Sequence, residues 1–162
     1  VGVNTALRVS DLLSLQVSNF VDKDGYARES SWLREHKSSK RYVLTLNDSI
    51  REAWELYAAA YPDVVSNQSN YVFFSLTATP GSEPIQRIQA WRIINALCAD
   101  VGLTGNYGTH TLRKTWAYHA RKNGVELSII MQRLNHTSLA TTMHYLGITD
   151  DDLREAALKL NL

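Results

Sequence analysis

Two short segments carry the residue types that chemistry on a phosphate group needs. In residues 109–114 (THTLRK), His110 and Arg113 stand three positions apart at the expected start of a helix, so their side chains can share one face. The start of a helix directs unpaired N–H groups outward, and a guanidinium can hold two oxygens of a phosphate at once. This spacing indicates an anion site, although an isolated HxxR pattern is also typical of ordinary helix surfaces.

The second segment, residues 134–145 (LNHTSLATTMHY), places His136 nine residues before Tyr145. A phenol is a poor nucleophile at neutral pH because its unperturbed pKa is about 10. Tyr145 would therefore need cations around the reacting phosphate and a neighbouring group that handles its proton. On its own, the segment is also typical of a tyrosine that is partly buried on a short helix.

The sequence gives no support to a metal site. It contains no HExxH motif and one cysteine, Cys98, and His110, His119, His136 and His144 do not have the spacing of zinc ligands. We therefore expect no metal and no cofactor, with His119 and His144 as bystanders. A single cysteine cannot form an internal disulfide, so a reducing cytoplasm is the expected compartment.

Positive charge is concentrated in two parts of the chain, although the net charge of the 162 residues is only +1. Residues 28–51 carry a net charge of +3 and residues 85–147 a net charge of +5. If the fold brings these segments together, they would form a surface suited to a nucleic-acid backbone. No apolar run approaches the roughly 18 residues of a membrane span, and no basic leader precedes an apolar stretch, so we expect no membrane association.

These residues must be positioned by an α+β domain that is mostly helical, with a small antiparallel sheet near its start. Alternation of Tyr42, Leu44 and Leu46 with polar neighbours predicts a strand with one buried face, after a polar turn over residues 36–40. The sheet is expected within residues 17–46, with a tight turn at residues 22–25. Apolar periodicity predicts helices over residues 5–15, 49–61, 84–102, 111–123, 127–134, 139–145 and 150–160.

Three details of these helices are further predictions. Ser49 and Glu52 are expected to form a capping box at the start of their helix. The helix that follows Pro84 is expected to turn a set of apolar side chains inward: Ile88, Trp91, Ile94 and Leu97. The last helix is expected to have one apolar side, made by Leu153, Ala157 and Leu160.

Taken together, the segments resemble the tyrosine recombinase (phage integrase) family. They occur in the order and with the approximate spacing of the motifs of that family. They are the first arginine box at residues 4–12 (NTALRVSDL), the hairpin turn at residues 37–40 (KSSK), the HxLR box at residues 110–113 (HTLR), and residues 134–136 (LNH) followed by Tyr145. The resemblance spans residues 7–148, and Asn135 stands where the family usually has Gly, a mild change because Asn tolerates left-handed backbone angles.

The resemblance implies that the chain cuts and rejoins DNA strands without a metal ion. Arg8 and Arg113 would hold the non-bridging oxygens of the scissile phosphate and stabilise the transition state. Tyr145 would attack phosphorus, form a 3′-phosphotyrosine and release a 5′-hydroxyl. Lys37 would be the general acid that protonates this leaving oxygen. Lys40, in the same turn, remains an alternative for that role.

The remaining roles that the resemblance implies are supporting ones. His110 and His136 would position the phosphate and assist proton transfer. Asp11 would be the supporting carboxylate of the family, orienting Arg8 or its helix rather than touching DNA. Further contacts to the DNA backbone are expected from three cations: Lys40, Arg41 and Lys114.

Residues 1–162 are expected to form one catalytic domain, because the sequence opens just before Arg8 without the amino-terminal DNA-clamping domain of the family. Double-stranded DNA is the implied partner, with self-association into a tetramer on DNA in the full-length protein. The implied source is a bacterium or phage, and the implied targets are chromosomal or mobile-element DNA. Two alternatives stay open at this point: a DNA-binding module that kept the fold and lost the reaction, and a small helical regulator whose basic segments are only surface.

Overall fold

The computed structural model describes residues 1–159 and has a mostly helical architecture with one two-stranded antiparallel sheet. The sheet pairs β1 (Ser30–Arg34) with β2 (Arg41–Thr45). The helices in chain order are α1 (Gly2–Thr5), α2 (Val9–Leu13), the 3-10 turn η1 (Val17–Asn19), α3 (Asp48–Ala60), α4 (Pro62–Val65), α5 (Arg87–Asp100), α6 (Thr109–Lys122), α7 (Leu127–Arg133), α8 (Leu139–Leu146) and α9 (Asp150–Lys159).

Helices α1 and α2 replace the single helix that was predicted over residues 5–15. Ala6 ends α1 in the left-handed region with φ 57°, and Arg8 is in an extended conformation that caps α2. The prediction was wrong because periodicity reports which residues are apolar and does not detect one residue that reverses the backbone direction. The break leaves the carbonyl of Ala6 free of helical hydrogen bonds, which matters for the site described below.

The hairpin of β1 and β2 is shorter than the predicted sheet. Residues 17–19 form η1, and residues 22–25 form the predicted turn, in which the carboxylate of Asp22 accepts hydrogen bonds from the backbone N–H groups of Asp24 and Tyr26. In β2, Tyr42 and Leu44 are buried, as the alternation predicted.

One hydrophobic core lies between this hairpin and helix α3. Phe20 stacks on Trp54 of α3 with ring centroids 4.6 Å apart, and both side chains are buried. The start of α3 is capped by Asn47, whose side chain accepts a hydrogen bond from the N–H of Ile50. The predicted capping box of Ser49 and Glu52 was therefore wrong, because the capping residue is two positions earlier, at Asn47, and its side chain binds the N–H group of Ile50.

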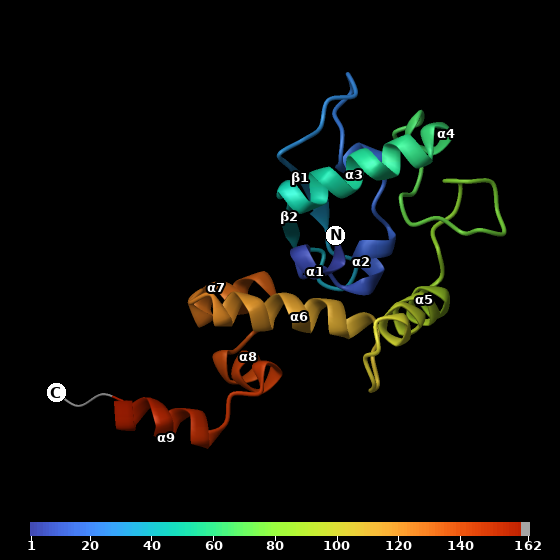
Figure 1. Cartoon of the computed structure of the whole chain (residues 1–162). Helices are drawn as coiled ribbons and strands as arrows, with labels where there is room; N and C mark the ends of the chain where they lie inside the picture. Colours follow the sequence, from blue (N-terminus) through green and yellow to red (C-terminus); the bar gives the residue numbers. More distant parts are fainter. Residues whose placement is uncertain (160–162) are drawn as a thin grey trace.

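A second core joins α6, α7 and α8. Its buried side chains are Ala6, Ala117, Ala120, Ile130 and Leu134. Figure 1 shows α1 to α4 and the sheet in the upper half of the molecule and α6 to α8 in the lower half. Helix α1 lies against α6 and helix α2 lies against α5, so the segment around Arg8 is at the junction of the two halves.

Helix α5 does not bury its apolar face, contrary to prediction. Ala90 is buried and Ile94 is half-buried, whereas Ile88, Trp91 and Leu97 are between 41% and 60% exposed. Apolar periodicity indicates that one face is apolar, but not that another part of the same chain covers it. Trp91 is therefore not a core residue, whereas Trp54 is buried and Trp116 is half-buried against the second core.

Helix α9 extends away from α8 at the end of the described chain (Figure 1). An ion pair of 3.1 Å between Arg121 of α6 and Asp152 connects it to the rest of the molecule. Of its predicted apolar side, Ala157 is exposed, and the side chain of Leu153 and all of Leu160 lie outside the described residues. Within residues 1–159, no helix combines the length and the apolar character needed to cross a membrane.

Candidate active site

All six residues that the resemblance implied as catalytic line one cavity of about 520 Å³. The cavity is bounded by the start of α2, the hairpin turn, the first turns of α6, the loop between α7 and α8, and α8. Its lining residues are Arg8, Lys37, Ser38, Lys40, His110, Arg113, Asn135, His136, Thr137, Thr141 and Tyr145. The structure thus brings together side chains that are up to 137 positions apart in the sequence.

The two arginines of the cavity are held in different ways. Arg113 is buried, and it donates from Nη1 to the carbonyl of Ala6 at 2.7 Å and from Nη2 to the carbonyl of Leu134. Arg8 is more accessible, and its Nη1 lies 2.6 Å from the carboxylate of Glu35. Burial, and then the positive charge of Arg8, lower the pKa of Arg113, which still remains protonated at neutral pH. Each guanidinium keeps N–H groups that these contacts do not use, so both can bind an anion.

His136 and Tyr145 form a pair at the other side of the cavity. Their rings meet edge to face with centroids 5.2 Å apart. Burial, with the nearby charges of Arg113 and Arg8, lowers the pKa of His136 below its ordinary value of 6.5, so the ring is neutral at pH 7. Nδ1 of His136 lies 3.1 Å from the hydroxyl of Thr142, which in turn donates to the carbonyl of Ser138. This chain of hydrogen bonds favours a proton on Nδ1 and leaves Nε2 as an acceptor.

The hydroxyl of Tyr145 is buried and has no hydrogen-bond partner among the described residues. Burial raises the pKa of this phenol, and the charge of Arg113 opposes that increase. In the structure the phenol is therefore protonated at neutral pH. It can become a nucleophile once a neighbouring base takes its proton as the new bond forms.

His110 and Lys37 line the cavity from exposed positions. His110 is in the first turn of α6, where the hydroxyl of Thr111 caps the helix by accepting a hydrogen bond from the N–H of Gly108 at 3.0 Å. His110 also lines a neighbouring cavity of about 750 Å³, which extends toward Trp91 and Lys114. Lys37 is at the hairpin turn, and Lys40 of the same turn donates to Oδ1 of Asn135 at 2.8 Å.

Asp11 is buried beside the site but contacts the hairpin rather than Arg8. Its Oδ1 accepts hydrogen bonds from the backbone N–H of His36 at 2.8 Å and lies 2.9 Å from Nδ1 of the same residue. Of the two roles expected for Asp11, orienting Arg8 directly was wrong, because Glu35 is the carboxylate that pairs with Arg8, whereas positioning of helix α2 stays a prediction. Asp11 instead holds the residue that directly precedes Lys37.

Glu35 is the site residue that the sequence analysis missed. Its side chain is only 2% exposed, and it receives hydrogen bonds from Ser38 and Asn135 in addition to the ion pair with Arg8. In the sequence it is one acid in a basic segment, which is typical of a solvated surface ion pair. Its position two residues before Lys37 was the available signal.

Glu35 makes the stability of the fold dependent on pH. Burial raises the pKa of Glu35, but the hydrogen bonds from Ser38 and Asn135 and the charge of Arg8 outweigh burial and hold the pKa below its ordinary 4.5. A carboxylate with a lowered pKa in the folded state stabilises the protein above pH 4.5, and this contribution is lost as the pH falls through the folded-state pKa. We expect Glu35→Gln to be less stable than wild type at pH 7 and to lose less stability on acidification.

Urea titrations between pH 7 and pH 3 measure this difference in the free energy of unfolding. Glu83→Gln is the matched control, because Glu83 is exposed and its carboxylate makes no ion pair or side-chain hydrogen bond with the described residues. If the free energy of unfolding had the same pH dependence in wild type and Glu35→Gln, Glu35 would not be the source of this stabilisation.

The other two cations expected to contact DNA lie outside the cavity. The guanidinium of Arg41 stacks on the exposed ring of Trp32 at 3.6 Å from its centroid. Nζ of Lys114 lies 5.6 Å from the ring centroid of Tyr145, on the side of the neighbouring cavity. Both are therefore on the surface that surrounds the site.

Within residues 1–159, no group of three or more His, Cys, Asp or Glu side chains is arranged to hold a metal ion.

Known proteins resemble this chain in family profile, in sequence and in fold. The sequence profile of the phage integrase family matches residues 1–151. The probable integrase/recombinase YoeC of Bacillus subtilis (strain 168) is 37% identical over 155 residues, which are 96% of this chain and 78% of YoeC.

The crystal structure of the XerA recombinase superposes with a TM-score of 0.74 at 26% identity, over 98% of this chain and 55% of that one. The site-specific recombinase XerH, in a post-cleavage complex with its palindromic difH substrate, has the same fold with a TM-score of 0.64 at 22% identity, over 96% of this chain and 42% of that one. The chain thus spans about half the length of these two recombinases.

Proposed function

The chain belongs to the phage integrase family of tyrosine recombinases, and from this we propose that it cleaves and rejoins DNA strands through a 3′-phosphotyrosine on Tyr145, without a metal ion. The observation that carries the proposal is the single cavity that six residues from five segments share. Two guanidinium groups, two imidazoles, an ammonium group and a phenol face it. This set supplies phosphate binding, a nucleophile, a base and an acid in one place.

In the proposed reaction, Arg8 and Arg113 bind the non-bridging oxygens of the scissile phosphate. Oη of Tyr145 forms a bond to phosphorus while the bond from phosphorus to the 5′-oxygen breaks. Nε2 of His136 takes the phenolic proton, and His110 holds the phosphate in line. Negative charge grows on the equatorial oxygens in the transition state, and fixed guanidinium donors stabilise it without reorganisation.

Lys37 is the proposed acid that gives a proton to the departing 5′-oxygen. Rejoining reverses each of these transfers, with the 5′-hydroxyl of another strand as the attacking group. The free energy of the broken phosphodiester bond is kept in the phosphotyrosine, so no nucleotide cofactor is needed.

The two lysines of the hairpin turn are expected to differ in their effect on cleavage. Loss of a general acid costs about 10²–10⁴ in rate, so Lys37→Ala is expected to lower single-turnover cleavage by this factor. Lys40→Ala is expected to weaken DNA binding with a smaller effect on the rate at saturation.

A substrate with sulfur in place of the bridging 5′-oxygen separates the two roles. A thiol has a pKa of about 8.5 and leaves without being protonated, so sulfur is expected to restore the cleavage rate of Lys37→Ala. If sulfur instead restored the cleavage rate of Lys40→Ala, the general acid would be Lys40.

We further propose double-stranded DNA as the substrate and a tetramer on DNA as the active assembly. The DNA complex of XerH and the basic residues around the cavity support the first point. The proposed tetramer is supported by helix α9, which extends away from α8 and exposes Leu158. Light scattering of the protein on a DNA duplex, with and without residues 150–162, measures the assembly. An unchanged mass after truncation would remove α9 from the proposed contact.

A DNA-binding module without catalytic activity is the alternative function. Trapping on a suicide duplex, nicked near the cleavage site in a DNA site selected by the wild-type protein, distinguishes the two. A denaturation-resistant protein–DNA adduct that forms in the presence of a chelator is expected. DNA binding without an adduct would favour the binding module.

A further inference from the structure

The carboxylate of Glu35 is the point at which three distant segments of the chain meet at the cavity. We propose that Glu35, which accepts a hydrogen bond from Asn135, is a positioning residue. It holds the turn that carries Lys37 in place next to Arg8. The inference rests on the proposed function for the role of Lys37, but its structural part stands independently of DNA. Glu35 and Asn135 are 100 positions apart, and neither was assigned a role by the sequence motifs.

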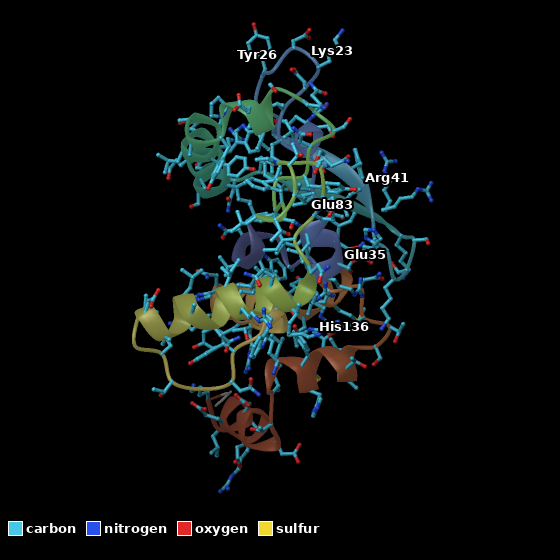
Figure 2. All side chains as sticks on the ribbon, turned by 90° about the vertical axis from the view of Figure 1, so that its right-hand side faces the viewer. Lys23, Tyr26, Glu35, Arg41, Glu83 and His136 are labelled. Carbon is cyan, nitrogen blue, oxygen red and sulfur yellow. The ribbon has the colours of Figure 1, made fainter. Side chains whose placement is uncertain are left out.

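Both oxygens of Glu35 are engaged by different segments. Oε1 lies 2.6 Å from Nη1 of Arg8 at the start of α2. Oε2 accepts from the hydroxyl of Ser38 in the turn at 2.5 Å, and from Nδ2 of Asn135 in the α7–α8 loop at 2.5 Å. Hydrogen bonds to an ionised carboxylate are roughly twice as strong as neutral ones. The carboxylate therefore joins the turn to the segments that carry Arg8 and His136, and Figure 2 shows Glu35 and His136 on the same side of the molecule.

The side-chain amide of Asn135 uses each of its groups on the same turn. Nδ2 donates to Glu35 and also to the hydroxyl of Ser38 at 2.9 Å, and Oδ1 accepts from Nζ of Lys40 at 2.8 Å. Three residues of one short turn are thus attached to one side chain of the α7–α8 loop. A glycine at position 135 would provide none of these contacts.

Lys37 lies between the anchored residues of the turn. Glu35 and Ser38 are held as described, and His36 is held by Asp11 through its backbone N–H at 2.8 Å. The Lys37 side chain itself is exposed and faces the cavity. An exposed lysine on an unsupported turn would spend little time at the leaving oxygen, and a general acid must be within hydrogen-bond reach to act. Anchoring of its neighbours is what keeps Lys37 at the cavity.

The backbone conformation of Asn135 allows its side-chain contacts to be tested separately from the backbone. Asn135 has φ 51°, a left-handed conformation that Gly adopts at least as readily as Asn. Asn135→Gly therefore removes the three side-chain contacts without backbone strain. Asn135→Asp keeps the shape of the side chain but places a second carboxylate at 2.5 Å from Glu35, where like charges repel. Asn67→Gly, in an exposed turn far from the cavity in sequence, is the matched control.

The first measurement is amide hydrogen exchange of residues 36–40 in the free protein. We expect faster exchange of this turn in Asn135→Gly than in wild type or Asn67→Gly, and faster still in Asn135→Asp. Exchange equal to wild type in Asn135→Gly would overturn the proposal, whatever the activity. Because this measurement uses no DNA, its result is separate from the success or failure of the proposed function.

The second measurement is single-turnover cleavage of the nicked duplex with oxygen or sulfur at the 5′-bridging position. With oxygen, Asn135→Gly is expected to be about tenfold slower at saturating DNA, as for a general acid that is in place only part of the time. With sulfur, its rate is expected to equal that of wild type. A defect that persists with sulfur would mean general damage to the fold and would overturn the positioning role. With sulfur, Glu35→Gln is expected to recover only part of the wild-type cleavage rate, because Glu35 also orients Arg8.

Discussion

Tyr145→Phe is expected to abolish the covalent protein–DNA adduct while leaving DNA binding intact. The phenolic oxygen is the atom that the proposed mechanism bonds to phosphorus, and Phe keeps the ring that packs against His136 and the second core. Loss of a covalent nucleophile elsewhere costs on the order of 10⁶ in kcat, so no adduct should be detectable. The substitution also removes a buried hydroxyl without a partner among the described residues, so the folded state should not be destabilised.

Gel electrophoresis under denaturing conditions, after incubation with the nicked duplex, measures the adduct. Tyr118→Phe is the matched control, because Tyr118 is exposed on α6 and lines a cavity of about 420 Å³ together with Tyr145. The control is expected to form the adduct at the wild-type rate. An adduct that survives in Tyr145→Phe would assign the nucleophile to another residue.

Arg113→Ala is expected to lose both activity and stability. Arg113 bridges the carbonyl of Ala6, where α1 ends, and the carbonyl of Leu134, where α7 ends. Its removal leaves two buried carbonyl groups unpaired, at a cost of about 1–3 kcal/mol each. Loss of one preorganised donor to the transition state is expected to lower the cleavage rate by at least about 10²–10³. Arg113→Lys keeps the charge but cannot reach both carbonyls, so it should restore only part of the stability.

Urea unfolding and single-turnover cleavage at a temperature where the variant is folded separate the two effects. Arg121→Ala is the matched control on the same helix, because Arg121 makes a partly exposed ion pair with Asp152. Such pairs contribute about 0–1 kcal/mol, so this variant should be close to wild type in stability and cleavage. Wild-type stability of Arg113→Ala would contradict the bridging role.

The family, the order of the motifs and most of the helices could be predicted from the sequence. Buried Tyr42 and Leu44, the turn at residues 22–25 and the helix that carries Arg113 follow from local rules of alternation, turn chemistry and periodicity. The six candidate catalytic residues could also be named, because the family motifs identify each of them by its sequence neighbours. These features depend on residues within a few positions of one another.

Only the tertiary structure decided the features that depend on distant residues. Glu35 is a buried partner of Arg8 because Asn135, 100 positions later, satisfies its second oxygen, and nothing near Glu35 in the sequence indicates this. The left-handed turn at Ala6 leaves a carbonyl that Arg113 binds from 107 positions away. The periodicity of α5 predicted a buried face, but burial requires a partner surface, and the described chain leaves most of that face exposed. Local sequence determines what a residue can do, whereas its environment is fixed by the segments that pack around it.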